Sequence, residues 1–336
     1  MINKFLESLY TKVFINIIVE NLQTLVYVEV CSGENVVENL HKKFDTTTIN
    51  SKMYEFVRVY LKESPFCYIS VLDKSPLQGA IPTCTASEMN SYCDITSSKY
   101  LCFSKEWSFY TSEYDLEAIK HDYRSIGVDF IFSPFVIMAE FFKDKINSTL
   151  SMFVLIEDNY IAFSVFDNSE LLYAEYLDME HHKDDEDLLM DSQLEEEELL
   201  LDIEGIDLEE VDLEDDIGSL DDFANIEDLD NSEDIDEFSE EQEVEESAHQ
   251  DVDIGTDGFN EDYQRFSLIQ SSLSNFYKNP IYKSQFIESV YVADGVGVSS
   301  DLKGYLEEEM FLSVYVRKID LGVSVCDMAK AELNEI

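Results

Sequence analysis

One segment of this chain cannot build a hydrophobic core, and it divides the 336 residues into two flanks. Residues 180–262 hold 38 acidic side chains against one basic residue, Lys183, and only three aromatic residues. A segment with so much net charge and so few large apolar side chains does not bury enough surface to offset its ordering entropy. We therefore expect residues 180–262 to form a disordered acidic insert within an otherwise globular protein.

The two flanks carry the other aromatic residues and account for only −14 of the formal charge of −51. They are long enough for one compact domain or two small lobes. Their lysines and arginines are dispersed among acidic residues, which argues against direct binding to nucleic acid. No run of about 20 apolar residues occurs, so we expect no membrane span, and any membrane association would require a partner.

The cysteines show no C-x-x-C pair and no spacing typical of a metal site. We interpret them as buried or idle thiols in a reducing compartment, which favours a cytoplasmic protein. The six residues are Cys31, Cys67, Cys84, Cys93, Cys102 and Cys326.

Short β-branched and aromatic runs in the first flank predict three strands, a helix and a further strand. These elements are expected at 13–19, 24–30, 35–44, 53–61 and 66–72. Turn residues dominate the next stretch, so we expect an irregular inserted segment over about 75–112. A helix at 115–126, closed by Gly127, and a strand at 129–133 then complete this half.

The second flank repeats the same order of elements around the acidic insert. A helix is expected at 135–142, opened by Pro134, and the later elements at 152–156, 161–166, 171–176, 264–276, 287–293, 301–309 and 312–316. Two halves with this order form a duplicated ribonuclease-H-like α/β fold. We assign residues 1–133 to the first half, and residues 134–179 with 263–336 to the second.

Three stretches resemble a known family. Residues 291–306 (Tyr-Val-Ala-Asp-Gly-Val-Gly-Val-Ser-Ser-Asp-Leu-Lys-Gly-Tyr-Leu), residues 311–316 and residues 125–134 are similar to the actin-like PilM and type II secretion protein L family. Asp294-Gly295 stands where that family usually has two glycines. The resemblance implies an actin-like two-lobed fold and a cytoplasmic scaffold that docks to an inner-membrane component, with a short partner peptide in a cleft between the lobes.

Actin-like ATPases hold nucleotide phosphates with Asp-x-Gly hairpins, in which glycine permits close approach of the backbone. The corresponding turns here, 20–23 and 157–160, contain no glycine and present carboxylates. We therefore expect no ATPase activity and no required cofactor. A vestigial ATP site at Gly295, Gly297 and Asp158 remains an alternative. The plainer interpretation is that the two glycines only allow a tight turn between a strand and a helix.

The acidic insert follows the third strand of the second half, where the actin-like plan carries a whole subdomain. We expect the insert to replace that subdomain. Aliphatic residues recur among its acids, which is typical of segments that fold on a basic partner, although a purely solvated spacer is also compatible. Its Asp-rich runs lack the glycine of a calcium loop, so we expect no metal site.

Three functions remain open. The first is a non-enzymatic scaffold of a type IV pilus, type II secretion or DNA-uptake machine. The second is an actin-like ATP-binding protein or ATPase. The third is an acidic interaction or decoy protein that binds a basic partner through residues 180–262.

Trp107, the single tryptophan, is expected in the core.

Overall fold

The computed structural model describes residues 10–33, 35–179 and 256–335. The expected disorder of residues 180–262, and their replacement of a subdomain, therefore fall almost entirely outside the described residues. Among the described residues, no helix is both long and apolar enough to cross a bilayer.

The first half is built on a five-stranded sheet with the order β3-β2-β1-β4-β8. Strand β1 pairs antiparallel with β2 and parallel with β4, and β8 continues the parallel side. The strands are β1 (Lys12–Val19), β2 (Thr24–Ser32), β3 (Asn35–Phe44), β4 (Phe66–Leu72) and β8 (Phe130–Phe132). Helices α2 (Ser51–Glu63) and α4 (Glu113–Asp122) connect them.

The second half repeats this topology in a sheet with the order β11-β10-β9-β12-β13. Its strands are β9 (Ser151–Ile156), β10 (Tyr160–Asp167), β11 (Glu170–Asp178), β12 (Ser289–Asp294) and β13 (Ser313–Lys318). Its helices are α5 (Pro134–Phe141), α6 (Lys143–Ile146), α8 (Thr256–Lys278), α9 (Ser300–Glu308) and α10 (Leu321–Glu335). Two such sheets in one chain make the fold actin-like, as the sequence predicts.

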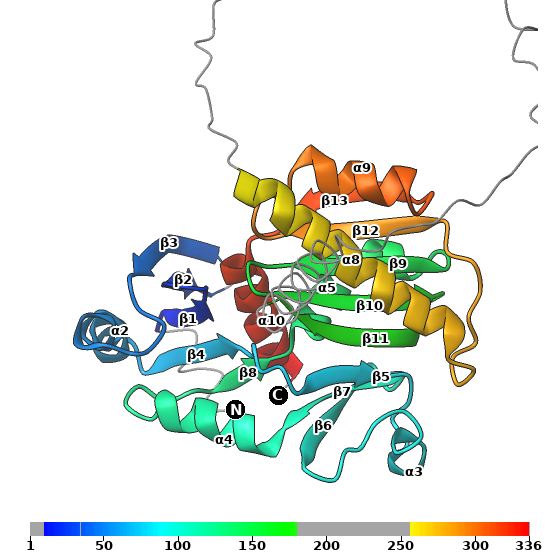
Figure 1. Cartoon of the computed structure of the whole chain (residues 1–336). Helices are drawn as coiled ribbons and strands as arrows, with labels where there is room; N and C mark the ends of the chain where they lie inside the picture. The colour runs from blue at the N-terminus through cyan, green and yellow to red at the C-terminus, as the bar shows by residue number, and fades with distance from the viewer. Residues whose placement is uncertain (1–9, 34, 180–255, 336) are drawn as a thin grey trace, which may run out of the picture. The chain divides into compact units, whose positions relative to one another are not determined.

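Three apolar clusters hold these layers. One lies between α2, α4 and the first sheet, and another packs α8 and α9 against the second sheet (Figure 1). The largest joins the two halves through α5 and α10, and it contains Phe14, Phe142, Phe153 and Val325. Strand β1 is buried on both faces because it faces one cluster on each side, and its sequence after Lys12 is apolar apart from Asn16.

The segment expected to be irregular contains a small antiparallel sheet, which corrects that expectation. Its order is β5-β7-β6, formed by Gln78–Ile81, Trp107–Ser112 and Ser98–Phe103, and the short α3 (Ala86–Met89) lies between β5 and β6. Gly79 lies in strand β5. A Cβ atom at this position would lie only 2.7 Å from the Tyr110 hydroxyl, so a larger residue would clash with that side chain. The glycine that looked like a turn signal therefore permits close strand packing. Trp107 is buried, as expected.

Two cysteines correct the interpretation of all six as thiols. Cys84 and Cys102 form a disulfide, with Cα atoms 5.4 Å apart. The turn before α3 and strand β6 bring them together, which their separation of 18 residues does not reveal. Cys31, Cys67, Cys93 and Cys326 are free. The cysteine argument for a reducing compartment therefore loses its support.

Helix α8 begins earlier than the sequence suggests, and α10 was not expected at all. Asp262, assigned to the insert, lies within α8 and is only 2% exposed. Helix α10 follows the second sheet in the chain but packs on β1, β2 and β4 of the first. There Lys330 forms an ion pair with Glu29, which also accepts hydrogen bonds from Tyr27 (2.9 Å) and Cys31 (3.2 Å).

We predict that Lys330→Met destabilises the protein by about 2–3 kcal/mol, because it leaves the buried Glu29 carboxylate without its cationic partner. Chemical denaturation at neutral pH measures the loss. Lys303→Met is the matched control, since Lys303 pairs with Glu307 at 3.6 Å with both side chains nearly half exposed, and it should cost less than about 0.5 kcal/mol. Equal effects of the two substitutions would contradict the importance of the buried pair.

Candidate functional site

Three turns meet where the two halves of the fold face each other. They follow β1 (Glu20–Gln23), β9 (157–159) and β12 (294–299). Strand β12 pairs in parallel with β9, which places Asp294 opposite Ile156 and lets the Gly295 N–H donate to the Ile156 carbonyl at 3.1 Å. A cavity of about 280 Å³ opens beside them. It is lined by Ile18, Glu20, Leu25, His41, Lys43, Glu157, Gly295, Ile319, Asp320 and Leu321.

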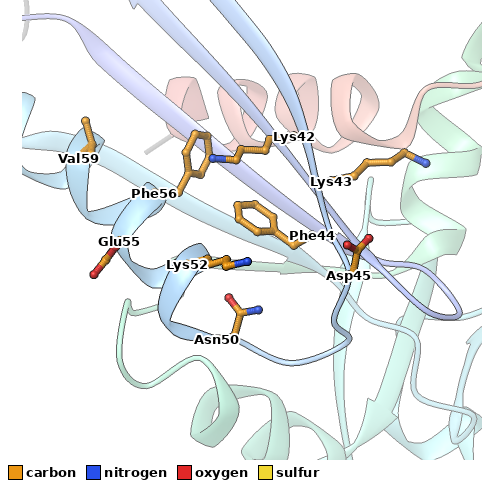
Figure 2. A pocket seen from close by; sticks show the side chains of 9 residues that line it. All are labelled: Lys42, Lys43, Phe44, Asp45, Asn50, Lys52, Glu55, Phe56 and Val59. Atoms are coloured by element: carbon orange, nitrogen blue, oxygen red, sulfur yellow. The ribbon is translucent and has the colours of Figure 1, made fainter.

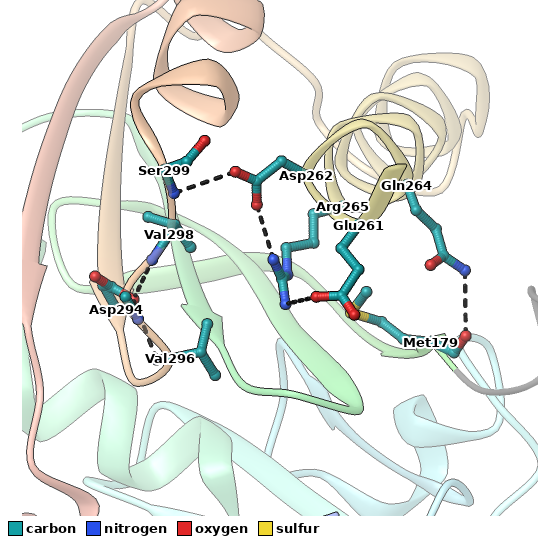
Figure 3. A network of polar contacts seen from close by, with 10 residues as sticks. Met179, Glu261, Asp262, Gln264, Arg265, Asp294, Val296, Val298 and Ser299 are labelled. Atoms are coloured by element: carbon teal, nitrogen blue, oxygen red, sulfur yellow. Dashed lines mark hydrogen bonds and ion pairs between the residues drawn. The ribbon is translucent and has the colours of Figure 1, made fainter. Parts of the chain in front are cut away.

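The turn after β12 is closed by its own carboxylate. Oδ1 of Asp294 accepts hydrogen bonds from the backbone N–H groups of Val296 (3.2 Å), Gly297 (2.6 Å) and Val298 (3.0 Å) (Figure 3). Gly297 has φ +86°, a conformation that favours glycine. Successive N–H groups of this kind form a nest that binds anions. In this protein an aspartate side chain already fills the nest.

Helix α8 completes the same turn from the outside. Oδ2 of Asp262 accepts the N–H of Ser299 at 3.1 Å, and Oδ1 accepts a bond from Arg265 at 2.8 Å (Figure 3). Arg265 also donates to Glu261 at 3.2 Å, and Gln264 donates to the carbonyl of Met179 at 3.2 Å. The N–H groups of residues 296–299 thus all donate to acidic side chains of the protein.

Gly295 serves a different purpose from the one its sequence context suggests. A Cβ atom built on it would overlap with Oε1 of Glu157, so the absent side chain makes room for a carboxylate of this protein. Gly297, by contrast, is needed for its backbone conformation, because its positive φ favours glycine. Asp158, the third residue of the proposed vestigial site, is exposed, and the cavity is lined by its neighbour Glu157.

Glu157 is the residue that sequence reasoning underrated. Its side chain is only 5% exposed, and its Oε1 has no hydrogen-bond partner among the described residues. Burial raises the pKa of this carboxyl to about 7, and nearby Lys74 partly opposes that rise. Burial also lowers the pKa of Lys74, whose ammonium lies 5.4 Å from the centre of the Tyr160 ring. The site therefore holds a buried carboxyl group with a partly buried lysine nearby.

A second hollow lies on the first half, between the end of β3 and helix α2 (Figure 2). Its volume is about 590 Å³, and its lining includes Lys42, Lys43, Lys52 and the rings of Phe44 and Phe56. The Lys42 ammonium lies 4.2 Å from the centre of the Phe56 ring. Asp45 and Glu55 also line this hollow, so their carboxylates offset part of the positive charge of the three lysines.

No group of three or more His, Cys, Asp or Glu side chains is arranged to hold a metal ion in the part of the chain that the structure describes.

We predict that Gly295→Ala destabilises the fold by about 1–3 kcal/mol, because the added methyl group overlaps with the Glu157 carboxylate. Gly304→Ala is the control: Gly304 lies in α9 with no atom near the added methyl, so this change should stabilise by about 0.5–1 kcal/mol. Combining Gly295→Ala with Glu157→Ala should cost less than the sum of the two single changes. Strict additivity in chemical denaturation would show that the two positions do not interact.

We also predict that stability falls as pH rises from about 5 to about 8, through the titration of Glu157. Its folded pKa of about 7 exceeds the ordinary 4.5, so the folded state retains a proton that the unfolded state has lost. Glu157→Gln removes this loss, and its advantage over the original protein should grow by about 3 kcal/mol between those pH values. Unfolding curves of the two proteins that stay parallel across this range would contradict the assignment.

Residues 152–334 match the family described as Domain of unknown function (DUF8341), and residues 10–139 match another, Domain of unknown function (DUF8569). No curated protein matches.

Among solved structures, a Bacteroides thetaiotaomicron protein with an actin-like ATPase fold and unknown function is similar at 10% identity and TM-score 0.45, covering 91% of each chain. The PilM-PilN type IV pilus biogenesis complex is similar at 8% identity and TM-score 0.46, covering 90% of this chain and 87% of that one. MreB 5 of Spiroplasma citri bound to AMPPNP is similar at 11% identity and TM-score 0.42, covering 96% of this chain and 97% of that one. Likenesses this distant say nothing about activity, so they add no function. The DUF8341 match spans more than half of the sequence, and the chain therefore belongs to the DUF8341 family.

Proposed function

We propose that this protein is a non-catalytic, actin-like scaffold that docks to an inner-membrane component of a type IV pilus, type II secretion or DNA-uptake machine. One observation carries the non-catalytic part: carboxylates of the protein itself take up the backbone donors and the space at the turn after β12. Asp294 occupies the nest of N–H groups, and Glu157 occupies the space left by Gly295.

Electrostatics support this proposal. A phosphate group near Glu20 and Asp294 would be repelled by each carboxylate, at roughly 3–4 kcal/mol per pair of unit charges about 5 Å apart in a partly buried site, and ionised Glu157 would add to this repulsion. The phosphate group would also have to replace the three hydrogen bonds to Asp294. Triphosphate binding would therefore require the turn after β12 to rearrange.

The choice of machine has a separate basis. It comes from the sequence resemblance of residues 125–134, 291–306 and 311–316 to the PilM and secretion protein L family. That resemblance also suggests that the partner is an inner-membrane protein with a short segment that enters the cleft, and that the scaffold works on the cytoplasmic side. The acidic residues 180–262 would then be available to a second, basic partner.

The first test concerns nucleotide. We expect no rise in the thermal unfolding temperature at millimolar Mg-ATP and no phosphate release above background. The competing proposal, an actin-like ATP-binding protein, predicts a rise that is lost in Gly297→Val. Such a rise would overturn the non-catalytic scaffold in favour of a nucleotide-binding protein.

The second test concerns docking. The full chain and a chain lacking residues 187–254 are immobilised and exposed to detergent-solubilised membranes. The deletion stops before α8, because Asp262 holds the Ser299 N–H. Both should retain the same integral-membrane pilus, secretion or uptake component. Retention by the full chain alone would favour the acidic decoy, and retention by neither would refute docking.

A further inference from the structure

The cavity between the two halves is lined by both apolar and charged side chains. Ile18, Ile319 and Leu321 are buried residues that line it, together with the partly buried Leu25. Its volume of about 280 Å³ is several times the roughly 30 Å³ that one water molecule occupies in the liquid. It therefore has room for a short alkyl chain that ends in a polar group.

Two of the three carboxylates that line this cavity already have cationic or polar partners. Glu20 pairs with Lys43 at 3.3 Å. Asp320 contacts His41 at 2.9 Å and accepts the N–H of Val323 at 3.0 Å.

Glu157 is the third carboxylate, and it has nearby Lys74 as a charge partner but, within the described part of the chain, no hydrogen bond to Oε1. It is 95% removed from solvent, it lines the cavity, and Oε1 has no hydrogen-bond partner among the described residues. A buried carboxylate oxygen without a donor is costly, because it loses hydration and gains no bond in exchange. A buried acceptor without a hydrogen bond, on a side chain that lines this cavity, is stabilised by a proton or by a cationic donor.

The chemistry of the lining favours an organic cation. Three carboxylates face the cavity against one lysine and one histidine, so an anion is disfavoured there. A divalent metal ion needs several oxygen ligands, whereas two of these carboxylates are already engaged. An ammonium or guanidinium group on an alkyl chain matches both parts of the cavity, since its head bonds a carboxylate and its methylenes cover apolar side chains.

We propose that this cavity binds an alkylammonium or alkylguanidinium group, with the cationic head at Glu157 and the alkyl part against Ile18, Leu25, Ile319 and Leu321. The group is carried either by a lysine or arginine of a docked partner, which rests on the proposed scaffold function, or by a free amine. The site thus takes a cation at the place where actin-like ATPases take phosphate.

Proton linkage gives this proposal a distinctive signature. Glu157 faces Lys74, Asp158, Glu20 and Asp294, and its pKa is raised to about 7 chiefly by burial. A bound cation favours the carboxylate over the carboxylic acid. Binding near pH 7 should therefore release a fraction of a proton, and affinity should rise with pH up to about 8.

Isothermal titration calorimetry of the full chain tests the site, with n-butylammonium chloride, n-butylguanidinium chloride and the neutral n-butanol as probes. Titrations at pH 7 in two non-amine buffers of different ionisation enthalpy count the protons released. We expect both cations to bind with proton release and butanol to bind at least about tenfold more weakly. Equal binding of butanol and the cations, or no binding of either cation, would overturn the proposal.

Two variants locate the binding. Glu157→Gln keeps the shape of the side chain and should weaken both cations about tenfold or more and abolish proton release. Glu117→Gln is the control: Glu117 is exposed on α4 and pairs with Lys120 at 2.8 Å, so binding should be unchanged. Unaltered binding by Glu157→Gln would refute the assigned site. Because this variant is expected to be stable at neutral pH, a lost signal would not reflect unfolding.

A third experiment distinguishes a side chain of a docked partner from a free amine as the source of the cation. The peptide acetyl-Gly-Lys-Gly-amide presents a lysine side chain on a backbone, and acetyl-Gly-Gln-Gly-amide is its neutral match. Tighter binding of the lysine peptide than of butylammonium would assign the site to a partner's side chain, and weaker binding to a free amine. If neither cation nor peptide binds while the membrane component is still retained, this inference fails and the docking function stands.

Discussion

The parallel pairing of β9 with β12 is the contact on which the centre of this molecule depends. It sets the end of one strand beside the end of the other, so that Asp294 and Glu157 approach the same turn from two directions. Asp294 then binds three successive N–H groups, and Glu157 lies against Gly295. The turn after β12 therefore cannot open toward a ligand without breaking hydrogen bonds within the protein.

The order of strands and helices could be predicted because each strand is a separate apolar run bounded by polar turns. The small sheet could not, because β5 has four residues and includes Gly79, whose role is visible only beside Tyr110. Helix α10 had a usable signal that was overlooked. Asp320 caps it, and Val325, Met328 and Ala329 recur at helical spacing on one face. The disulfide between Cys84 and Cys102 had none, because only the fold brings the two residues together.

The site was predictable in place but not in detail. Sequence reasoning located the carboxylate-bearing turns and both glycines of the 294–299 turn. It named Asp158, whereas Glu157 lines the cavity, because β9 is buried on both faces and lacks the alternation of polar and apolar residues that shows which way a side chain points. The roles of the two glycines, Gly295 and Gly297, could also be assigned only from the structure. Gly297 requires its backbone angle, whereas Gly295 requires the space that its missing Cβ leaves.

The position of α10 also has a consequence for the order in which the chain can fold. His41 and Asp320, which meet beside the cavity, are 279 residues apart in sequence. The face of the first sheet that Val325, Cys326 and Ala329 cover is therefore complete only after the ribosome has made nearly everything between them. Until then that apolar face stays open, so the first half cannot mature as an independent unit, and folding must wait for contacts of very long sequence separation. We expect such a chain to fold slowly and to rely on protection of this face during synthesis.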